Sequence, residues 1–256
     1  MLLAVDVGNT QTHVGMFRDD SLVEHWRFLT IRDATADELA ATLSAMLGLR
    51  GMELAQVDAG ICSSVVPSLA QEYAQVSVRY LDGSLLLVGP GLKIGMAIRM
   101  ENPHEVGPDR IVNAVAAYER CQGPCIVVDF GTAITYDAVS AEGDYLGGVI
   151  TPGIEISIEA LAVRAARLPR VDIAEPKEVI GRSTQAAIQS GVVYGFAGQV
   201  DAIVGRVREA MGSEATSIAT GGFATSIVPF CDLIDETDDL LTLEGLRLIW
   251  ERNAGG

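Results

Sequence analysis

Two aspartates of this chain stand in nearly the same short sequence. Asp6 lies in residues 2–10, which read LLAVDVGNT, and Asp129 lies in residues 125–133, which read CIVVDFGTA. Each segment is an apolar run that ends in Asp, a further apolar residue and Gly. Carboxylates beside a glycine turn can hold Mg²⁺ or another hard cation next to a phosphate group that the carboxylates alone would repel. The two segments therefore indicate that a phosphorylated ligand binds together with a cation.

The same segments indicate an internal duplication, because Asp129 follows Asp6 at close to half of the 256 residues. After each loop comes an alternating strand-like run, a polar turn and a second strand-like run. These runs cover residues 13–17 and 22–28 after the first loop, and residues 134–139 and 145–150 after the second. Both loops are therefore predicted to lie in β-hairpins.

The hairpins exclude two common nucleotide-binding motifs. Rossmann and P-loop sites run from strand to glycine loop to helix, and neither GxGxxG nor GxxxxGK[ST] occurs here. The only lysines, Lys93 and Lys177, lie outside glycine loops. Gly8 and Gly131 have no Cβ, so backbone N–H groups of these turns could come close to a phosphate. One such turn alone would be explained by its composition, but two in matching hairpins favour a phosphate site.

A third aspartate that could do chemistry lies in the segment GPDR, residues 107–110. An apolar i, i+4, i+7 face follows from Ile111 to Tyr118, which predicts Asp109 and Arg110 in the first turn of a helix. There Asp109 could accept a proton from a hydroxyl, and Arg110 could hold a carboxylate. The alternative is that Asp109 only complements the helix dipole, and the tetrapeptide alone favours that interpretation.

Composition narrows the class of protein. The chain has 18 Lys and Arg against 34 Asp and Glu, a net charge of −16 that argues against a nucleic-acid partner. With 49% hydrophobic residues it is predicted to be globular, and no run approaches the ~20 apolar residues of a membrane span. The start has no signal-peptide features, and the four cysteines lack zinc-ligand spacing. We expect a cytoplasmic protein with reduced thiols and no membrane association.

Helix signals place the candidate residues in an alternating α/β order. Thr35 and Glu38 predict a capping box, residues 153–167 predict a helix, and Thr184 is predicted to cap a long helix that reaches about Met211. Three glycines at small-residue spacing on the long helix permit close approach of another helix, either in the core or at a subunit interface. They are Gly191, Gly195 and Gly198.

Two hairpins followed by SIATGG at residues 217–222 resemble the superfamily of actin, sugar kinases and heat-shock chaperone ATPases. The resemblance implies an α/β fold of duplicated ribonuclease-H-like domains, the actin-like ATPase fold, with a nucleotide cleft between them. It implies a first domain over residues 1–115 and a second over residues 116–256. Gly221 and Gly222 would form the turn beside the adenosine.

Within that superfamily the chain resembles type III pantothenate kinases, whose motifs occur here in the same order. They are DVGNT at 6–10, ENP at 101–103, GPDR at 107–110, DFGTA at 129–133, GGxIxPG at 147–153 and GxST at 181–184. These motifs cover nearly the whole chain. The resemblance implies transfer of the γ-phosphoryl group of ATP to the primary hydroxyl of pantothenate, the first step of coenzyme A biosynthesis.

The resemblance also implies a role for each matching residue. Asp109 would be the proton acceptor, Asp6 would help to place Mg²⁺, and Asp129 would hold a monovalent cation, K⁺ or NH₄⁺. Pantothenate would contact Gly107, Pro108, Asp109, Arg110 and Thr184, the last across the interface of a homodimer. ATP would contact Asp6, Val7, Gly8, Asn9, Thr10, Gln11, Thr12, His13, Thr132, Gly221 and Gly222.

Two positions depart from the family pattern. Pro108 replaces the usual alanine, which a first helical turn tolerates. Met100 stands where some members have a tyrosine that contacts pantothenate. Two other functions stay open at this point: a kinase for another small hydroxyl or carboxyl acceptor, and a nucleotide-binding accessory or regulatory protein of the same fold.

Overall fold

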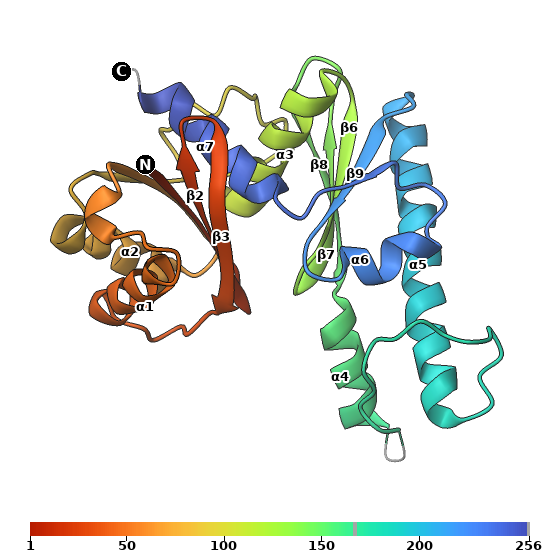
Figure 1. Cartoon of the computed structure of the whole chain (residues 1–256). Helices are drawn as coiled ribbons and strands as arrows, with labels where there is room; N and C mark the ends of the chain where they lie inside the picture. Colours follow the sequence, from red (N-terminus) through yellow and green to blue (C-terminus); the bar gives the residue numbers. More distant parts are fainter. Residues whose placement is uncertain (166–167, 255–256) are drawn as a thin grey trace. The chain divides into compact units, whose positions relative to one another are not determined.

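The computed structural model describes residues 1–165 and 168–254. The chain forms two compact units, each with its own five-stranded sheet (Figure 1). The first unit contains residues 1–95, residues 102–116 and the segment from Thr242 onward, and the second contains residues 96–101 and 117–241. The C-terminal segment therefore belongs to the first unit. The domain boundary between residues 115 and 116 stays a prediction.

The strands of the first unit are β1 (Leu2–Val7), β2 (Gln11–Arg18), β3 (Ser21–Leu29), β4 (Ala59–Ser64) and β5 (Leu85–Leu87), and those of the second are β6 (Cys125–Phe130), β7 (Ala133–Val139), β8 (Tyr145–Pro152), β9 (Thr216–Thr220) and β10 (Glu236–Thr237). The α-helices are α1 (Ala36–Gly48), α2 (Pro67–Tyr80), α3 (Pro108–Cys121), α4 (Ile154–Arg164), α5 (Thr184–Met211), α6 (Ala224–Ile227) and α7 (Leu241–Ala254). Short 3₁₀ helices cover Leu54–Gln56, Pro103–Glu105 and Val228–Phe230.

The two sheets have the same topology. The strand order is β3-β2-β1-β4-β5 in the first unit and β8-β7-β6-β9-β10 in the second. In each, the first strand of the unit pairs antiparallel with its hairpin partner on one side and parallel with a later strand on the other. Asp6 on β1 and Asp129 on β6 occupy equivalent places in the two sheets. The structure thus confirms the predicted hairpins and the duplicated ribonuclease-H-like fold.

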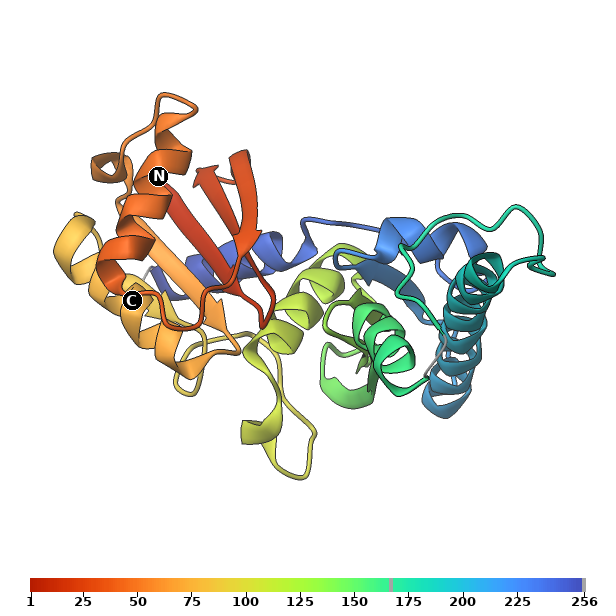
Figure 2. The ribbon, with the colours of Figure 1, turned by 90° about the horizontal axis from the view of Figure 1, so that it is seen from below.

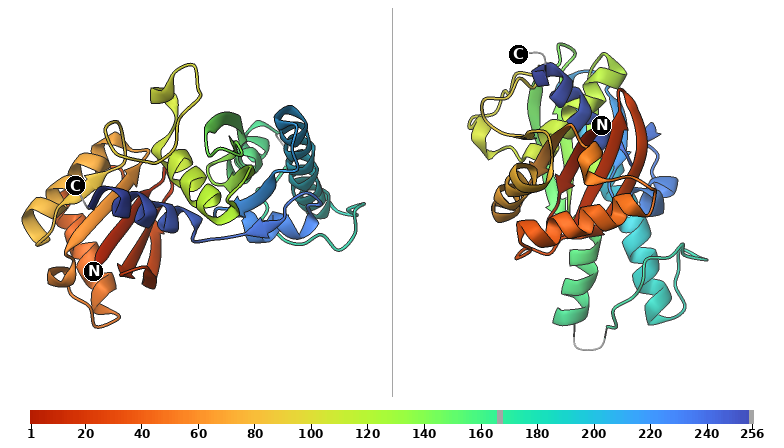
Figure 3. Two further views of the ribbon diagram at one scale, coloured as in Figure 1. Left: turned by 90° about the horizontal axis from the view of Figure 1, so that it is seen from above. Right: turned by 60° about the vertical axis from the view of Figure 1, so that its left-hand side comes forward.

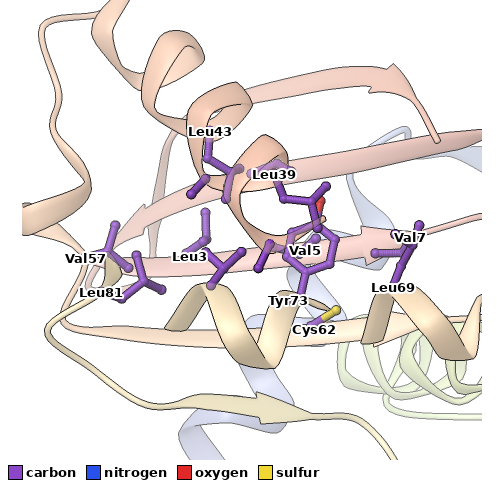
Figure 4. Packing of buried hydrophobic residues seen from close by; sticks show 14 of the residues in the cluster. Leu3, Val5, Val7, Leu39, Leu43, Val57, Cys62, Leu69, Tyr73 and Leu81 are labelled. Carbon is purple, nitrogen blue, oxygen red and sulfur yellow. The ribbon is translucent and has the colours of Figure 1, made fainter. Parts of the chain in front are cut away.

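One face of the first sheet packs against α1 and α2. Leu3, Val5 and Val7 point from β1 toward these helices and are fully buried with Leu43 of α1 and Tyr73 of α2 (Figure 4). Alternate residues of β1 share this face because side chains alternate along a strand. Burial of such apolar side chains stabilises the unit by roughly 1.5–3 kcal/mol each.

The opposite face of the first sheet packs against α7, which runs beside the strands in Figure 3. A Cβ at Gly15 of β2 would lie 2.9 Å from Leu243 Cδ1, so glycine at this position lets the helix approach closely. A Cβ at Gly245 would lie 2.2 Å from the Val112 carbonyl oxygen of α3, so α7 and α3 also pack closely. Asp6 is on this second face of the sheet, two residues along β1 from Ala4, the partner of Gly15.

The second sheet is covered on one face by α4, α5 and α6 (Figure 1). Ile126, Val128 and Phe130 of β6 point into this core, so Asp129 lies on the other face. Figure 2 shows α4 and the first half of α5 side by side. Both hairpin carboxylates are therefore on the sheet face that is turned away from the main apolar core of their unit.

Local sequence signals explain most helix ends. Thr35 and Glu38 form the predicted capping box of α1, and α3 starts at Pro108 as expected. The N-cap of α5 is Ser183, whose hydroxyl accepts from the Ala186 N–H at 3.1 Å, so the prediction of Thr184 as N-cap was wrong by one residue. Thr184 is instead the first helical residue. In the helix predicted over residues 153–167, Gly153 is the N-cap of α4, and the last two positions lie outside the described residues.

No helix in the described part of the chain has both the length and the apolar run that a membrane span requires. The four cysteines are free thiols.

Candidate active site

The first hairpin loop consists of Gly8, Asn9 and Thr10, between β1 and β2. The Gly8 N–H donates to the Gln11 carbonyl at 3.0 Å. A Cβ at Gly8 would lie 2.8 Å from that same carbonyl oxygen. Glycine is therefore required here for closure of the turn, and its own N–H group is used within the hairpin instead of pointing to a ligand.

A row of polar side chains crosses the first sheet one step before this loop. Asp6 on β1 lies in register with Ser63 on β4, with His13 on β2 and, through His13, with Arg27 on β3. Laterally paired side chains share a face of the sheet, so these four residues lie side by side. The next row into the sheet is Ile61, Ala4 and Gly15. We call the four residues the polar row.

His13 in the polar row is an uncharged imidazole near neutral pH. Burial, together with the charges of Arg27 and His25, lowers the pKa of His13 to about 3. Its Nε2 lies 3.1 Å from His25 Nδ1, so one of the two rings donates to the other. His13 therefore offers no positive charge for a phosphate.

Arg32 supplies a positive charge beside the first loop that no sequence motif predicts. Its guanidinium donates to Asn9 Oδ1 at 3.1 Å, which fixes an exposed cation next to the residues expected to bind phosphate. Arg32 follows β3 and belongs to no sequence motif. It lies beside Asn9 because the chain returns toward the first hairpin after β3. Guanidinium groups bind phosphate oxygens well because they present a planar set of donors.

The second hairpin loop is one residue shorter and consists of Gly131 and Thr132. The Gly131 N–H donates to the Ala133 carbonyl at 3.1 Å. Asp129 lies in register with Thr135 on β7 and with Thr220 on β9. The second sheet therefore repeats the pattern of the first, in which a carboxylate has a hydroxyl residue beside it on the parallel strand.

Two glycines let other loops approach the second hairpin. Gly221 has φ +92°, and a Cβ there would lie 2.4 Å from Asp129 Oδ1 and 2.7 Å from the Phe130 backbone. Gly153 donates its N–H to the Thr132 carbonyl at 3.2 Å, and a Cβ on it would lie 2.2 Å from that oxygen. The structure therefore brings together three residues singled out from the sequence, namely Asp129, Thr132 and Gly221.

A buried carboxylate adjoins this cluster on β7. Asp137 is fully buried and accepts from the Tyr145 hydroxyl at 2.6 Å and from the Thr135 hydroxyl at 3.0 Å. A hydroxyl has one hydrogen to donate, so Thr135 presents only acceptor lone pairs to any further partner. Beside Asp129, an oxygen of this kind suits a cation. Motif comparison gave no signal for Asp137 or Tyr145.

Asp109 and Arg110 lie in the first turn of α3, as predicted. Asp109 Oδ1 accepts from the Arg110 N–H at 2.9 Å, and a Cβ at Gly107 would lie 2.5 Å from the same oxygen. Glycine at 107 thus leaves room for the carboxylate. Asp109 thus places a negative charge at the N-terminus of α3, where the helix dipole favours it.

Thr184 lies apart from the second hairpin cluster, at a cavity between α4 and α5. The cavity has a volume of about 580 Å³, and apolar residues such as Ile158 and Phe196 line it together with Thr184. Gly191, Gly195 and Gly198 of α5 are exposed, and a Cβ on any of them would meet no atom of the described residues within 4 Å. The three glycines therefore do not mediate close packing within the part of the chain that the structure describes.

Met100 contacts β8. Its Sδ would lie 2.9 Å from a Cβ at Gly147, which has φ +114°. The position that departs from the family pattern is thus occupied by a thioether packed over a glycine.

Among the described residues no three His, Cys, Asp or Glu side chains gather as a metal site. A Mg²⁺ ion delivered with ATP needs only one or two carboxylates from the protein, and Asp6 in the polar row fits that requirement.

The two sheets of equivalent topology give this chain the actin-like ATPase fold, which sugar kinases also have. The inorganic polyphosphate/ATP-glucomannokinase of Arthrobacter sp. strain KM has the same fold, with a TM-score of 0.53 at 15% identity over 100% of this chain and 99% of that chain.

Sequence comparison is more specific. The family model of type III pantothenate kinases matches residues 2–206. The type III pantothenate kinase of Moorella thermoacetica is 49% identical over 99% of this chain and 100% of its own. That of Streptomyces griseus is 52% identical over 99% of each chain. This chain belongs to the type III pantothenate kinase family.

Proposed function

We propose that this chain transfers the γ-phosphoryl group of ATP to the primary hydroxyl of pantothenate, the first step of coenzyme A biosynthesis. The observation that carries the proposal is identity of about half the residues, over the whole chain, to type III pantothenate kinases. Phosphoryl transfer depends on alignment and charge neutralisation more than on covalent chemistry by the protein. The carboxylates of the two hairpins and of Asp109 are suited to these tasks. So are the guanidinium groups of Arg32, beside the first loop, and of Arg110, which follows Asp109.

ATP binding is assigned to residues of both hairpins and of the Gly-Gly turn. They are Asp6, Val7, Gly8, Asn9, Thr10, Gln11, Thr12, His13, Thr132, Gly221 and Gly222. Mg²⁺ supplies charge neutralisation for the phosphates when it is bound, and Asp6 would help to hold it. Because Gly8 and Gly131 use their own N–H groups within the hairpins, the phosphate donors are expected among the later loop residues and Arg32.

Replacing Arg32 tests this arrangement. We expect Arg32→Ala to raise the KM for ATP about tenfold, the loss expected for one charge-assisted hydrogen bond, and to leave the midpoint of thermal unfolding unchanged. Steady-state kinetics at saturating pantothenate measure the effect. Arg50→Ala is the matched control, because Arg50 is also an exposed guanidinium and its ion pair is with the Glu24 carboxylate at 2.6 Å, away from the first loop residues 8–10. An equal KM in both variants would remove Arg32 from the site.

The acceptor site is assigned to the start of α3. Asp109 would accept the proton from the attacking hydroxyl, and Arg110 would hold the carboxylate of pantothenate. Gly107 and Pro108 would complete the contacts, together with Thr184 across the interface of a homodimer. The position of Asp109 in the first helical turn supports this role, since the helix dipole favours a negative charge there.

A monovalent cation, K⁺ or NH₄⁺, is proposed at Asp129. The support is an oxygen-rich setting, with the Asp129 carboxylate in register with the hydroxyls of Thr135 and Thr220. The Thr135 hydrogen bond to Asp137 leaves the Thr135 oxygen as an acceptor toward that side. A cation here would offset negative charge in a protein with a net charge of −16.

We also propose a homodimer in the cytoplasm. The open glycines of α5 and the apolar cavity beside α4 support a subunit interface at this helix pair. The four free thiols and the need for ATP support the location. Light scattering tests the dimer, and we expect a mass of twice the 27.1 kDa of one chain.

The direct test of the function is ADP release by the purified protein with Mg²⁺ and ATP, run in paired K⁺ and Na⁺ buffers over a panel of acceptors. The panel contains pantothenate, a hexose, glycerol and acetate. We expect release only with pantothenate, and faster release in K⁺. Release with another acceptor, or ATP binding without release, would move the assignment to the other small-molecule kinases or to a regulatory protein.

A further inference from the structure

Ser63 presents a buried hydroxyl without a hydrogen-bond partner. The residue is fully buried at the carboxyl end of β4, and its Oγ meets no donor or acceptor among the described residues. Proteins rarely leave a buried polar group unsatisfied, because the group loses its water without any compensation. An unpaired serine hydroxyl at this place makes the folded protein less stable than alanine would. Its presence therefore indicates that the hydroxyl gains a hydrogen-bond partner when a ligand binds.

The neighbour of Ser63 across β1 is Asp6. The register of the two parallel strands pairs these residues, and the pair before them, Val5 and Cys62, points into the opposite face, where Figure 4 shows both. Ser63 and Asp6 therefore share the face of the polar row. Asp6 is only half-buried and stands at the end of its strand, next to the loop expected to bind phosphate. Its carboxylate is the acceptor closest in register to the orphaned hydroxyl.

The second unit repeats this arrangement. Thr220 on β9 is buried and stands beside Asp129 as Ser63 stands beside Asp6. A hydroxyl residue next to the hairpin carboxylate is thus present in both halves of the chain, although the strands β4 and β9 otherwise differ in sequence.

We propose that Ser63 is a positioning residue for Asp6: when ATP binds with Mg²⁺, the Ser63 hydroxyl donates to one oxygen of the Asp6 carboxylate, and the other oxygen faces the cation. This rests on the proposed role of Asp6 at the Mg²⁺–ATP complex. A carboxylate that receives such a bond is held in one orientation and loses less freedom when the cation binds. In the free protein the hydroxyl stays unpaired, and the ligand-bound state satisfies it.

Loss of the Ser63 hydroxyl should affect ligand binding but not the stability of the free protein. Removing an unsatisfied buried hydroxyl should not destabilise the free protein, because no hydrogen bond is lost. Ser63→Ala is therefore expected to have a thermal midpoint in EDTA equal to or above that of the wild type. The same variant is expected to need about 10–100-fold more Mg²⁺ for half-maximal ATP binding, the effect typical of losing a hydrogen bond to a metal-binding carboxylate.

The experiment uses isothermal titration of the full chain with ATP, at graded Mg²⁺ and in EDTA, together with thermal unfolding of each free protein. Ser63→Thr is the rescue variant, because Thr220 shows that threonine suits the equivalent position. Tyr73→Phe and Ser213→Ala are matched controls, since each removes another buried hydroxyl without a partner, away from the polar row. Both controls should match Ser63→Ala in the stability of the free protein and keep the Mg²⁺ requirement of the wild type.

Three results would overturn the proposal. One is a wild-type Mg²⁺ requirement in Ser63→Ala, and another is a thermal midpoint several degrees lower in EDTA, which would reveal a structural partner. The third is a Ser63→Thr variant that folds but behaves like Ser63→Ala. Pantothenate-dependent turnover of the wild type is measured on the same preparation, so failure of the proposed kinase activity is seen separately from failure of the Ser63 role.

Discussion

Replacing Asp109 by asparagine should lower turnover about 10²–10⁴-fold, the range typical of losing a general base. Asparagine keeps the size of the side chain and can still accept from the Arg110 N–H, so α3 should begin as before. ATP affinity and the thermal midpoint should therefore change little. Steady-state kinetics with pantothenate, together with titration calorimetry for ATP, measure the two effects on one preparation.

Glu155→Gln is the control for this prediction. Glu155 is also an acidic residue in the first turn of a helix, α4, but it is exposed and forms a surface ion pair with Arg170 at 3.6 Å. It should retain wild-type turnover, because complementing a helix dipole contributes only about 0.3–1 kcal/mol to stability. A folded Asp109→Asn protein with turnover like that of Glu155→Gln would show that Asp109 only complements its helix.

The second large effect is expected at Gly221. A Cβ there would overlap Asp129 Oδ1 and the Phe130 backbone, and φ of +92° strains any residue with a side chain. We expect Gly221→Ala to destabilise the protein by about 1–3 kcal/mol from the backbone conformation alone, and further from the overlap. Because the displaced atoms belong to the second hairpin, the activation by K⁺ should also fall.

Gly222→Ala separates these causes, since a Cβ at Gly222 would meet no atom within 4 Å in residues 1–165 and 168–254. Chemical denaturation should place its free energy of unfolding close to that of the wild type, well above that of Gly221→Ala. An equal loss of unfolding free energy in both variants would mean that the turn is sensitive to any side chain. The close approach of Gly221 to Asp129 would then not be the cause of the destabilisation.

The duplicated fold could be predicted because its signal is local. The two aspartates, their glycines and the alternating runs after them predict hairpins, and the structure has these hairpins as β1-β2 and β6-β7. The capping box at Thr35 and the start of α3 at Pro108 also follow from neighbouring residues. The N-cap of α5 was missed by one residue because serine and threonine, adjacent at 183 and 184, are both good caps.

What sequence could not predict depends on contacts between distant segments. Arg32 reaches Asn9 only after β3 has returned along β2, and Ser63 lies beside Asp6 only because β4 pairs parallel to β1. The sequence predicts that a glycine at position 8 lets backbone N–H groups of the turn come close to a phosphate, and this stays a prediction. It could not predict that the N–H group of Gly8 itself closes the turn. The roles of the candidate site residues stay predictions, and the variants described above test them.

The measurement that tests the central claim most directly is identification of the product. The purified protein is incubated with Mg²⁺, ATP and pantothenate in K⁺ buffer, and the product is examined by mass spectrometry and phosphorus NMR. The account predicts one added phosphoryl group, present as a phosphomonoester of the primary hydroxyl, formed in equal amount to ADP and absent with Asp109→Asn on the same time scale. Unmodified pantothenate after full incubation, or a phosphate on its carboxylate, would contradict it.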